Sequence, residues 1–298
     1  MDEILEDLNS AELEEWKTVI REWRDKMCFD SDGYVDAAVA LFEGSLGDSM
    51  SVDEFILQCR EKSYTLYLED ESKMNSALIA WLGLNRPYAK ELLSKAMSDN
   101  LLTLENLDLE TLTESEFERR FAGAVGQYGG AIYPYLYALG SSNTNSRRAR
   151  SGQVFEKLIY RTLDALGLSY DDQSTVGQRE FEAVGLGKKV DAILPSTEAY
   201  AQKRDDCVII SMKTSLRERW QQLVEELQRT RVPHIYLATL GEDLNEDKLR
   251  VMKEHNITVV IPTNLKVANY SSIKNVIGFE AFFKKDLAYR MQPWGADW

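Results

Sequence analysis

The sequence has few cysteines, no long apolar run and too few basic residues to balance its acids. Its three cysteines, Cys28, Cys59 and Cys207, are far apart, which is typical of neither a disulfide framework nor a zinc site and favours a reducing cytosol. The uncharged stretch 121–140 holds five glycines, a proline and four tyrosines, so we expect buried core there and no membrane span. Residues 1–7 are too acidic to be expected to form a signal peptide.

The scarcity of basic residues is confined to one half of the chain. Overall, 35 Lys and Arg face 49 Asp and Glu, and the net charge of −14 at first argues against a nucleic-acid partner. Residues 1–140 hold 12 basic and 28 acidic side chains, a net charge of −16, whereas residues 141–298 hold 23 and 21, a net charge of +2. The second half is therefore still able to bind a polyanion through local basic patches.

What the sequence does contain is ordinary for a soluble protein. Its 298 residues, 44% hydrophobic and 28% charged, suffice for one large domain or two modest ones. Residues 1–120 show apolar side chains at helical spacing, and Ser51-Val-Asp-Glu54 has the pattern of a capping box. The small polar segment Ser141–Asn145 is the best linker candidate. We therefore predict an acidic helical region over 1–140 and a second domain over 141–298.

The second half alternates between helical and strand patterns. An amphipathic helix is expected at 153–166. Short apolar runs predict strands at 189–194, 207–212, 234–238 and 257–261, and helical spacing predicts helices at 216–230 and 245–254. This alternation indicates an α/β (α+β) fold with a central sheet flanked by helices.

Two neighbouring predicted strands carry residues suited to phosphodiester hydrolysis. The first carries Asp191, and the second, Val208-Ile-Ile, ends in Ser211-x-Lys213. A carboxylate can bind Mg²⁺, which takes one or two such ligands, and a lysine can assist the attacking water or stabilise the transition state. The usual place for a second carboxylate is two residues before the lysine, where this chain has Ser211.

The helix predicted after Lys213 supplies another candidate for that second carboxylate. Its buried side is expected to hold apolar residues that include Val224. On the same helical wheel Glu225 lies nearly opposite, facing solvent, whereas Glu226 lies at the border and can turn toward the sheet. We therefore expect Glu226 to be the second metal ligand.

The first turn of the same helix carries Arg217-Glu218-Arg219. Arginine pairs bidentately with guanine, and glutamate accepts from cytosine N4, so the tripeptide suits adjacent G·C pairs in a major groove. The alternative is structural: Glu218 completes a capping box with Ser215, and the arginines are surface charge.

The densest basic cluster is Arg147, Arg148 and Arg150. It can hold phosphates of a DNA backbone, or it can be a solvated charge run. Glu156 follows in the first turns of the helix at 153–166, where an exposed glutamate is usually only a good helix former.

Together these residues resemble restriction endonucleases of the PD-(D/E)XK superfamily, in particular the EcoRII/SsoII/PspGI/PfoI group. The resemblance covers about residues 147–230. It rests on the segment Arg150–Glu156, on Val190-Asp191, on Ser211-x-Lys213, on the segment Arg217–Trp220 and on Glu226, with 35 residues from Glu156 to Asp191, 22 from there to Lys213 and 13 more to Glu226.

The resemblance implies a PD-(D/E)XK nuclease core with a central mixed sheet in a cytoplasmic, prokaryotic enzyme. Asp191 and Glu226 would bind Mg²⁺, Lys213 would assist the water and Glu156 would help from its helix. Arg217, Glu218 and Arg219 would read CC·GG bases.

The resemblance also implies a homodimer on double-stranded DNA. It would cut ahead of the CC half of CCNGG, or of an extended site such as TCCNGGA, and leave 5′ overhangs. Relatives of the SsoII type flip the central nucleotides into a pocket with an arginine and an aromatic residue four positions later. Arg60 and Tyr64 have that spacing, and Trp81 is an alternative.

Two competing functions remain open from the sequence. One is a structure-selective or repair nuclease of the same fold, against which the Arg-Glu-Arg tripeptide argues. The other is a non-enzymatic acidic helical interaction protein in which Asp191 and Lys213 form a structural ion pair.

Overall fold

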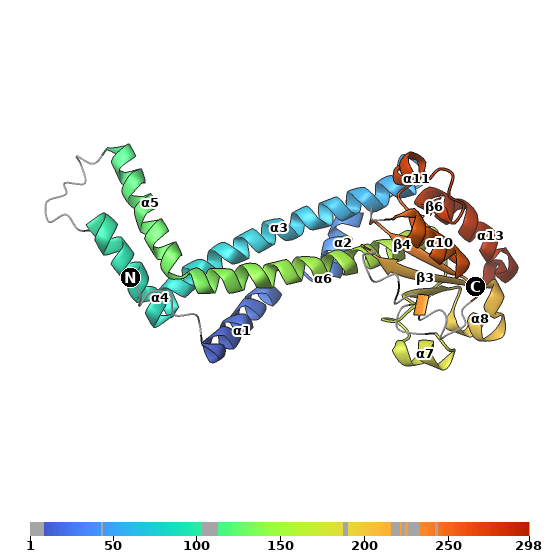
Figure 1. Ribbon diagram of the computed structural model, residues 1–298, viewed down its shortest axis with the longest axis horizontal. Coiled ribbons are helices and arrows are strands. Elements are labelled where there is room, and N and C mark those ends of the chain that lie inside the picture. The colour runs from blue at the N-terminus through green and yellow to red at the C-terminus, as the bar shows by residue number, and fades with distance from the viewer. Residues whose placement is uncertain are drawn as a thin grey trace. The chain divides into compact units, whose positions relative to one another are not determined.

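The computed structural model describes residues 9–42, 44–102, 113–186, 190–215, 221, 224–225, 233–241 and 244–297. The chain forms two compact units, each built from two stretches of sequence. The helical unit comprises Met1–Asp30 and Thr65–Ala149, and the sheet unit comprises Ser31–Tyr64 and Arg150–Trp298. Figure 1 labels most of the elements of both.

The helical unit consists of α1 (Ser10–Met27), the later part of α3 (Val52–Asn85), α4 (Pro87–Met97), a π-helical turn (Ser98–Leu102), α5 (Glu114–Ala131) and the first part of α6 (Tyr133–Ala165). Asn9 caps α1 through a reciprocal capping box with Glu12. The buried Trp16 ring stacks on Trp81 at 6.5 Å and meets Tyr135 edge-on at 5.6 Å, so aromatic packing joins α1, α3 and α6.

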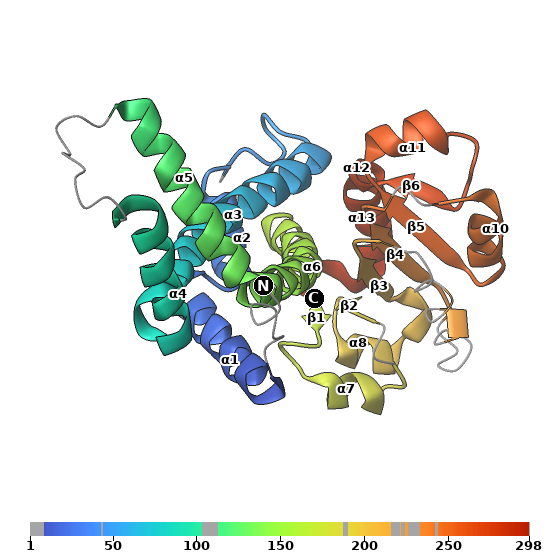
Figure 2. The ribbon, with the colours of Figure 1, turned by 60° about the vertical axis from the view of Figure 1, so that its left-hand side comes forward.

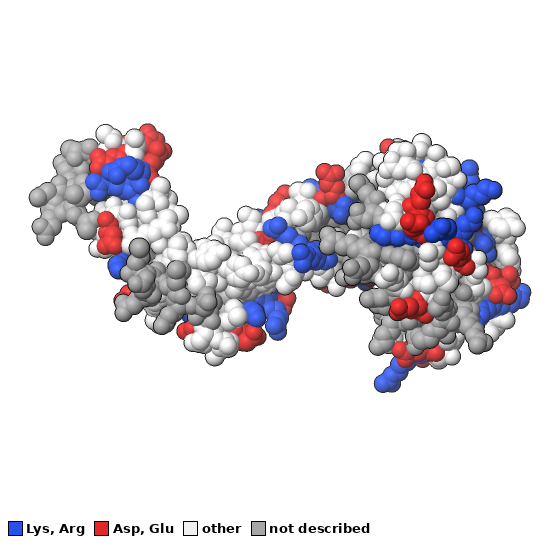
Figure 3. Space-filling view, in the orientation of Figure 1, with Lys and Arg blue, Asp and Glu red and all other residues white. Residues whose placement is uncertain are grey.

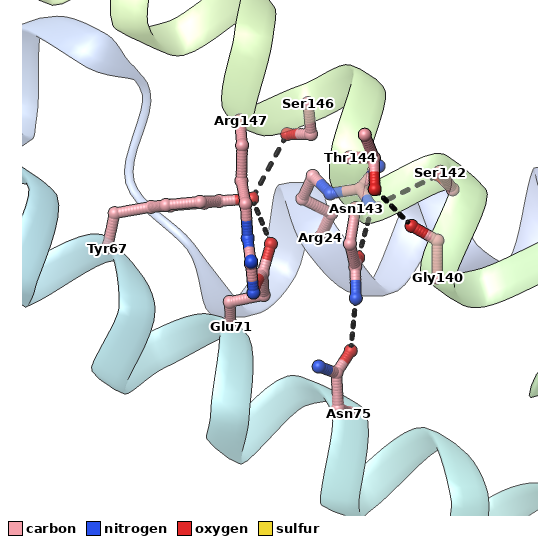
Figure 4. A network of polar contacts seen from close by, with 10 residues as sticks. All are labelled: Arg24, Tyr67, Glu71, Asn75, Gly140, Ser142, Asn143, Thr144, Ser146 and Arg147. Carbon is pink, nitrogen blue, oxygen red and sulfur yellow. Dashed lines mark hydrogen bonds and ion pairs between the residues drawn. The ribbon is translucent and has the colours of Figure 1, made fainter.

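The predicted linker at Ser141–Asn145 is helical instead and lies inside α6. Its polar side chains have partners on neighbouring helices (Figure 4). The buried Asn143 accepts a hydrogen bond of 2.9 Å from Arg24 and donates one of 2.9 Å to Asn75. Small polar residues that are satisfied in this way no longer favour a loop, and the prediction was therefore wrong.

The expectation of buried core over residues 121–140 is also largely wrong. Phe121, Val125, Tyr133 and Tyr137 are each more than half exposed, and the stretch forms the surface of α5 and the start of α6. Lack of charge here marks an apolar surface. Among the helices of the described residues, none is long and apolar enough to span a bilayer.

The sheet unit contains a six-stranded mixed sheet in the order β1–β6. The strands are β1 (Asp171–Asp172), β2 (Ala192–Leu194), β3 (Val208–Lys213), β4 (Ile235–Thr239), β5 (Ile257–Ile261) and β6 (Val276–Gly278). The pairs β1–β2 and β2–β3 are antiparallel, and the remaining pairs are parallel. The predicted mixed-sheet α/β fold is thus confirmed, and the four predicted strands are found within three residues of their expected bounds.

Both faces of the sheet are buried, which explains why its strands read as continuous apolar runs. Each face of the sheet has its own core cluster of buried residues. Successive residues of β3 point to opposite faces, so Ile210 belongs to one cluster and Ile209 to the other. The first cluster includes residues of α2 (Ser31–Ala40), α3, α6, α12 (Phe279–Ala281) and α13 (Leu287–Met291). The second includes residues of α7 (Gln178–Ala183), α8 (Thr197–Gln202) and α10 (Glu246–Glu254). Figure 2 shows α10 on the side of the sheet away from α13.

The first turn of α3 is fixed by two sets of hydrogen bonds. The predicted capping box is present, because the Glu54 main-chain nitrogen donates to the Ser51 hydroxyl and Glu54 accepts from the Ser51 main-chain nitrogen. Asp53 in turn accepts from the main-chain nitrogens of Thr263, at the start of α11 (Thr263–Asn269), and of Glu280. The start of α3 is therefore joined to the C-terminal helices of the sheet unit.

Candidate active site

Asp191 and Lys213 meet where β2 and β3 pair. Asp191 lies directly before β2, and its main-chain nitrogen donates to the Ile210 carbonyl at 2.9 Å, which extends the antiparallel ladder by one residue. Lys213 is the last residue of β3. The sheet register therefore places the two side chains together, and Lys213 Nζ lies 3.0 Å from Asp191 Oδ2.

One oxygen of the Asp191 carboxylate accepts every hydrogen bond that the described residues donate to this side chain. Besides Lys213, Oδ2 accepts from the Met212 main-chain nitrogen at 2.5 Å and from the Ser211 hydroxyl at 3.3 Å. Among these residues, Oδ1 is left to bind a ligand or water. The ion pair is partly shielded, with side-chain exposures of 22% for Lys213 and 16% for Asp191.

Ser211 lies two residues before Lys213, where a second carboxylate was sought, and its side chain is used differently. Its side chain is fully buried, and its hydroxyl donates to Asp191. A hydroxyl that donates to the first carboxylate helps to hold that carboxylate in place, but it cannot supply a second negative ligand.

Glu156 on α6 belongs to the same electrostatic neighbourhood. Burial, and after it the negative charge of Asp191, raise the pKa of Glu156 to about 7, although Lys213 and Lys157 act in the opposite direction. The half-buried glutamate therefore keeps its proton to a higher pH than an exposed glutamate does. It is not the exposed helix former that its place in the sequence alone would favour.

Tyr160 was not identified from the sequence, although it follows Glu156 by one helical turn. Its hydroxyl donates a hydrogen bond of 3.0 Å to the Asp191 main-chain carbonyl, and its ring stacks on Tyr170 with centroids 5.3 Å apart. Burial raises the pKa of Tyr160, which keeps the hydroxyl protonated and able to donate. The spacing of four residues from Glu156 was the available signal.

The donor set fits a hard cation such as Mg²⁺. Among the described residues no group of three or more His, Cys, Asp and Glu side chains is gathered in a cage. Mg²⁺ does not need one, since it is usually held by one or two carboxylates together with water and phosphate oxygens. The carboxyls of Asp191 and Glu156 repel each other, and a cation between such groups relieves that repulsion.

Several predicted site residues lie outside the described part of the chain. These are the metal-ligand candidate Glu226 and the base readers Arg217, Glu218 and Arg219. Two neighbours on the same predicted helix are described. Val224 is buried and Glu225 is exposed, as the helical wheel predicted.

The three arginines predicted to contact phosphates differ in their surroundings. Arg147 pairs with Glu71, which is only 1% exposed and also accepts a hydrogen bond of 2.6 Å from the Tyr67 hydroxyl (Figure 4). Arg150 lies over the Tyr34 ring at 5.7 Å. Arg148 is exposed, and no hydrogen bond or ion pair joins it to another described residue. Of the three, Arg148 has the guanidinium most open to a phosphate.

The candidate pocket residues Arg60 and Tyr64 are one turn apart on α3, and both are exposed. The alternative, Trp81, is already engaged in packing. It stacks on Trp16, contacts Trp23 at 6.4 Å and carries Arg86 over its ring at 5.8 Å. The structure thus favours Arg60 and Tyr64 over Trp81 as side chains open to a ligand.

Comparison with known proteins gives consistent matches. A family described as EcoRII C terminal matches residues 116–283. The type II restriction enzyme SsoII of Shigella sonnei is 36% identical over 149 residues, 50% of this chain and 49% of that protein. The type II restriction enzyme EcoRII of Escherichia coli is 25% identical over 131 residues, 43% of this chain and 30% of that protein. The matches thus span half or less of these curated relatives.

Two solved structures are similar over most of the chain. Ecl18kI, metal-depleted and in complex with uncleaved, modified DNA, has a TM-score of 0.73 at 23% identity and covers 95% of this chain and 86% of its own. PspGI, in a complex with substrate DNA, has a TM-score of 0.55 at 15% identity and covers 89% of this chain and 94% of its own. At these identities the likeness establishes the fold.

Proposed function

Because the chain belongs to the EcoRII C-terminal family, we propose that it is a type II restriction endonuclease that hydrolyses double-stranded DNA. The observation that carries the proposal is the Asp191–Lys213 ion pair at the β2–β3 junction, with Glu156 electrostatically coupled to it. A carboxylate, a lysine and a second carboxyl around one point are the groups that metal-assisted phosphodiester hydrolysis requires. The DNA-bound structures of Ecl18kI and PspGI support the same substrate class.

The proposed site holds Mg²⁺ through Asp191 and Glu226. When bound, the ion would polarise the phosphate and lower the pKa of its bound water. Lys213 would place its side-chain nitrogen beside the reacting phosphate, and Glu156, whose pKa is raised to about 7, would exchange a proton near neutral pH. Metal dependence is further supported by a second Ecl18kI structure, in which the metal-depleted protein is in complex with uncleaved DNA.

The proposed recognition residues are Arg217, Glu218 and Arg219, which would read adjacent G·C pairs from the major groove. The site would have CC and GG halves, as in CCNGG or TCCNGGA, with cleavage ahead of the CC half to leave 5′ overhangs. Arg60 and Tyr64 would hold a flipped central nucleotide, an arrangement that their exposure on one face of α3 supports. Phosphate contacts are proposed for Arg148 first, and for Arg147 and Arg150 as parts of the same basic cluster.

A homodimer is proposed because a pseudo-palindromic site presents two equivalent halves to two equivalent subunits. Catalysis is assigned to region 141–298, and dimerisation with part of the DNA contact to the acidic helical region 1–140. The structure-selective and the non-enzymatic alternatives become outcomes of the decisive experiment.

The experiment is digestion of a sequenced plasmid with Mg²⁺ and, in parallel, with EDTA, followed by mapping of the ends. Discrete Mg²⁺-dependent fragments that end at CC…GG sites are expected. Cutting confined to junctions or flaps would replace the proposal with a repair-type nuclease. A folded protein that neither cuts nor binds DNA would replace it with an interaction protein. Asp191→Asn is the matched control, because it keeps the side-chain shape and removes the charge.

A further inference from the structure

Among the described residues, helix α5 packs mainly on α4 and on the π-helical turn that follows α4. Ala124 is its single fully buried side chain among the described residues, and Gln127 bonds to Asp99 and Asn100 at the end of the preceding helix. Phe117, Phe121 and Val125 are each about half exposed. In Figure 3 the charges of α5 gather toward its N-terminal end and the remaining surface is largely uncharged.

This exposed face is both apolar and acidic. Glu114, Glu118, Phe121 and Val125 follow one another at intervals of four, three and four residues, so they project from the same side of the helix, and Phe117 borders them. Both glutamates are exposed. The face spans about 17 Å from Glu114 to Val125 at a helical rise of 1.5 Å per residue.

The α1–α6 groove, also in the helical unit, has the complementary character. It is a cavity of about 1040 Å³ that runs along α6 from Tyr133 to Ala149, which is about 24 Å of helix. Exposed Tyr133 and Tyr137 supply its apolar wall. Its other wall is the basic side of α1.

The basic side of α1 repeats the spacing of the α5 face. Lys17, Arg21 and Arg24 lie at intervals of four and three residues and line the α1–α6 groove, where Asp25 is the one acidic residue among the described residues of the lining. Arg24 is fixed in place by hydrogen bonds to Ser142 and Asn143 (Figure 4). A basic groove with aromatic walls complements the charge of an acidic helix with aromatic side chains, and the groove is long enough to hold the α5 face.

We propose that helix α5 of a second copy of this chain binds in the α1–α6 groove. Phe121 and Val125 would pack on Tyr133 and Tyr137, and Glu114 and Glu118 would pair with the cations of α1. This inference rests on the proposed homodimer and assigns it a surface.

A second copy is favoured over a different partner because one chain carries both halves of the contact. No residue of α5 lines the groove of its own chain. Two chains related by a two-fold axis would each donate one helix and one groove, so the contact would form twice and close on itself. A large apolar surface rimmed by charge is otherwise unfavourable in water.

Cysteine cross-linking tests the contact directly in the full-length protein. Phe121→Cys and Tyr137→Cys are made on two chains with different tags, which are mixed and mildly oxidised. The native cysteines are buried, so a disulfide-linked hetero-tagged dimer is expected only in the mixture of the two variants. Phe121→Cys mixed with Tyr289→Cys, an exposed position in the sheet unit, is the matched control.

Charge reversal provides a second, independent readout by sedimentation equilibrium. Glu118→Arg and Arg21→Glu should each weaken self-association by about tenfold or more, and the double variant should regain most of that loss. Both positions are exposed, and circular dichroism checks that each variant folds.

The outcomes separate this inference from the proposed function. A disulfide between two Phe121→Cys chains would overturn the α5–groove contact. Self-association that is unchanged in every charge-reversal variant would overturn it as well. If the wild-type protein still cleaves at discrete sites, the restriction-enzyme proposal stands and the dimer uses another surface. If the variants cross-link as expected but the wild-type protein never cuts DNA, the proposed function fails and the surface stands.

Discussion

The hydroxyl of Tyr160 donates a hydrogen bond of 3.0 Å to the main-chain carbonyl of Asp191. This bond connects helix α6 to the residue before β2, and α6 also carries Glu156. The helix that carries Glu156 therefore also fixes the main chain at Asp191, the candidate metal-binding carboxylate. The relationship makes Tyr160 a positioning residue.

Tyr160→Phe should reduce cleavage by about tenfold while leaving DNA binding unchanged, because a small displacement of a metal ligand costs rate more than affinity. The lost hydrogen bond should lower the free energy of unfolding by about 1 kcal/mol. Tyr236→Phe is the control, since it removes a hydroxyl that bonds Asp286 instead. Equal loss of activity in both variants would show that Tyr160 acts through stability alone.

Lys213→Met should lower the cleavage rate by about a hundredfold or more and keep DNA binding, because the role proposed for the lysine is to act on the reacting phosphate and water. Single-turnover cleavage and gel-shift titration in Ca²⁺ measure the two properties. Lys284→Met, which breaks an ion pair with Glu280 of 2.6 Å, is the control for lost surface charge. A large fall in unfolding free energy with no change in cleavage would make Asp191–Lys213 a structural pair.

Glu156 should make stability depend on pH in the absence of metal. Its folded pKa of about 7 lies above the ordinary glutamate value of 4.5, so the folded state binds the proton more tightly than the unfolded state. The contribution of Glu156 to the free energy of unfolding is therefore fully present below pH 4.5 and is lost as the pH rises through 7.

Glu156→Gln should therefore raise the free energy of unfolding relative to the wild type more at pH 8 than at pH 5. The difference between the two pH values should be at most about 3 kcal/mol. Urea unfolding in EDTA at the two pH values measures the difference. Glu225→Gln is the control, because Glu225 is exposed. A wild-type and a Glu156→Gln protein with the same pH dependence would contradict the assignment.

Arg148→Ala should weaken DNA binding uniformly across sequences and reduce the slope of log K against log salt by about 1. Arg147→Ala is an informative comparison, since it leaves the buried Glu71 without its cation and should destabilise the fold. An unchanged salt slope for Arg148→Ala would remove that residue from the phosphate contacts.

Glu218→Ala should reduce discrimination at one C·G pair by about 1–3 kcal/mol, because a glutamate reads cytosine N4. The measurement is the ratio of kcat/KM for the preferred site and for a site with that pair replaced. An equal fall of kcat/KM on both substrates would assign Glu218 to helix capping.

The sequence by itself determined the elements whose signals are local. Strands such as Val208–Lys213 are buried on both faces and so read as short apolar runs, and the Ser51–Glu54 capping box depends on residues three apart. The pairing of Asp191 with Lys213 was also accessible, because residues at the ends of adjacent strands are brought together by the sheet itself.

The tertiary structure decided what depends on distant neighbours. Asn143 looks like a linker residue until Arg24 and Asn75 satisfy its amide inside α6. Glu156 looks like a helix former until burial and the charge of Asp191 raise its pKa. Burial and long-range hydrogen bonds arise only when remote segments pack together, and for that reason a linear pattern of residue types cannot encode them one residue at a time.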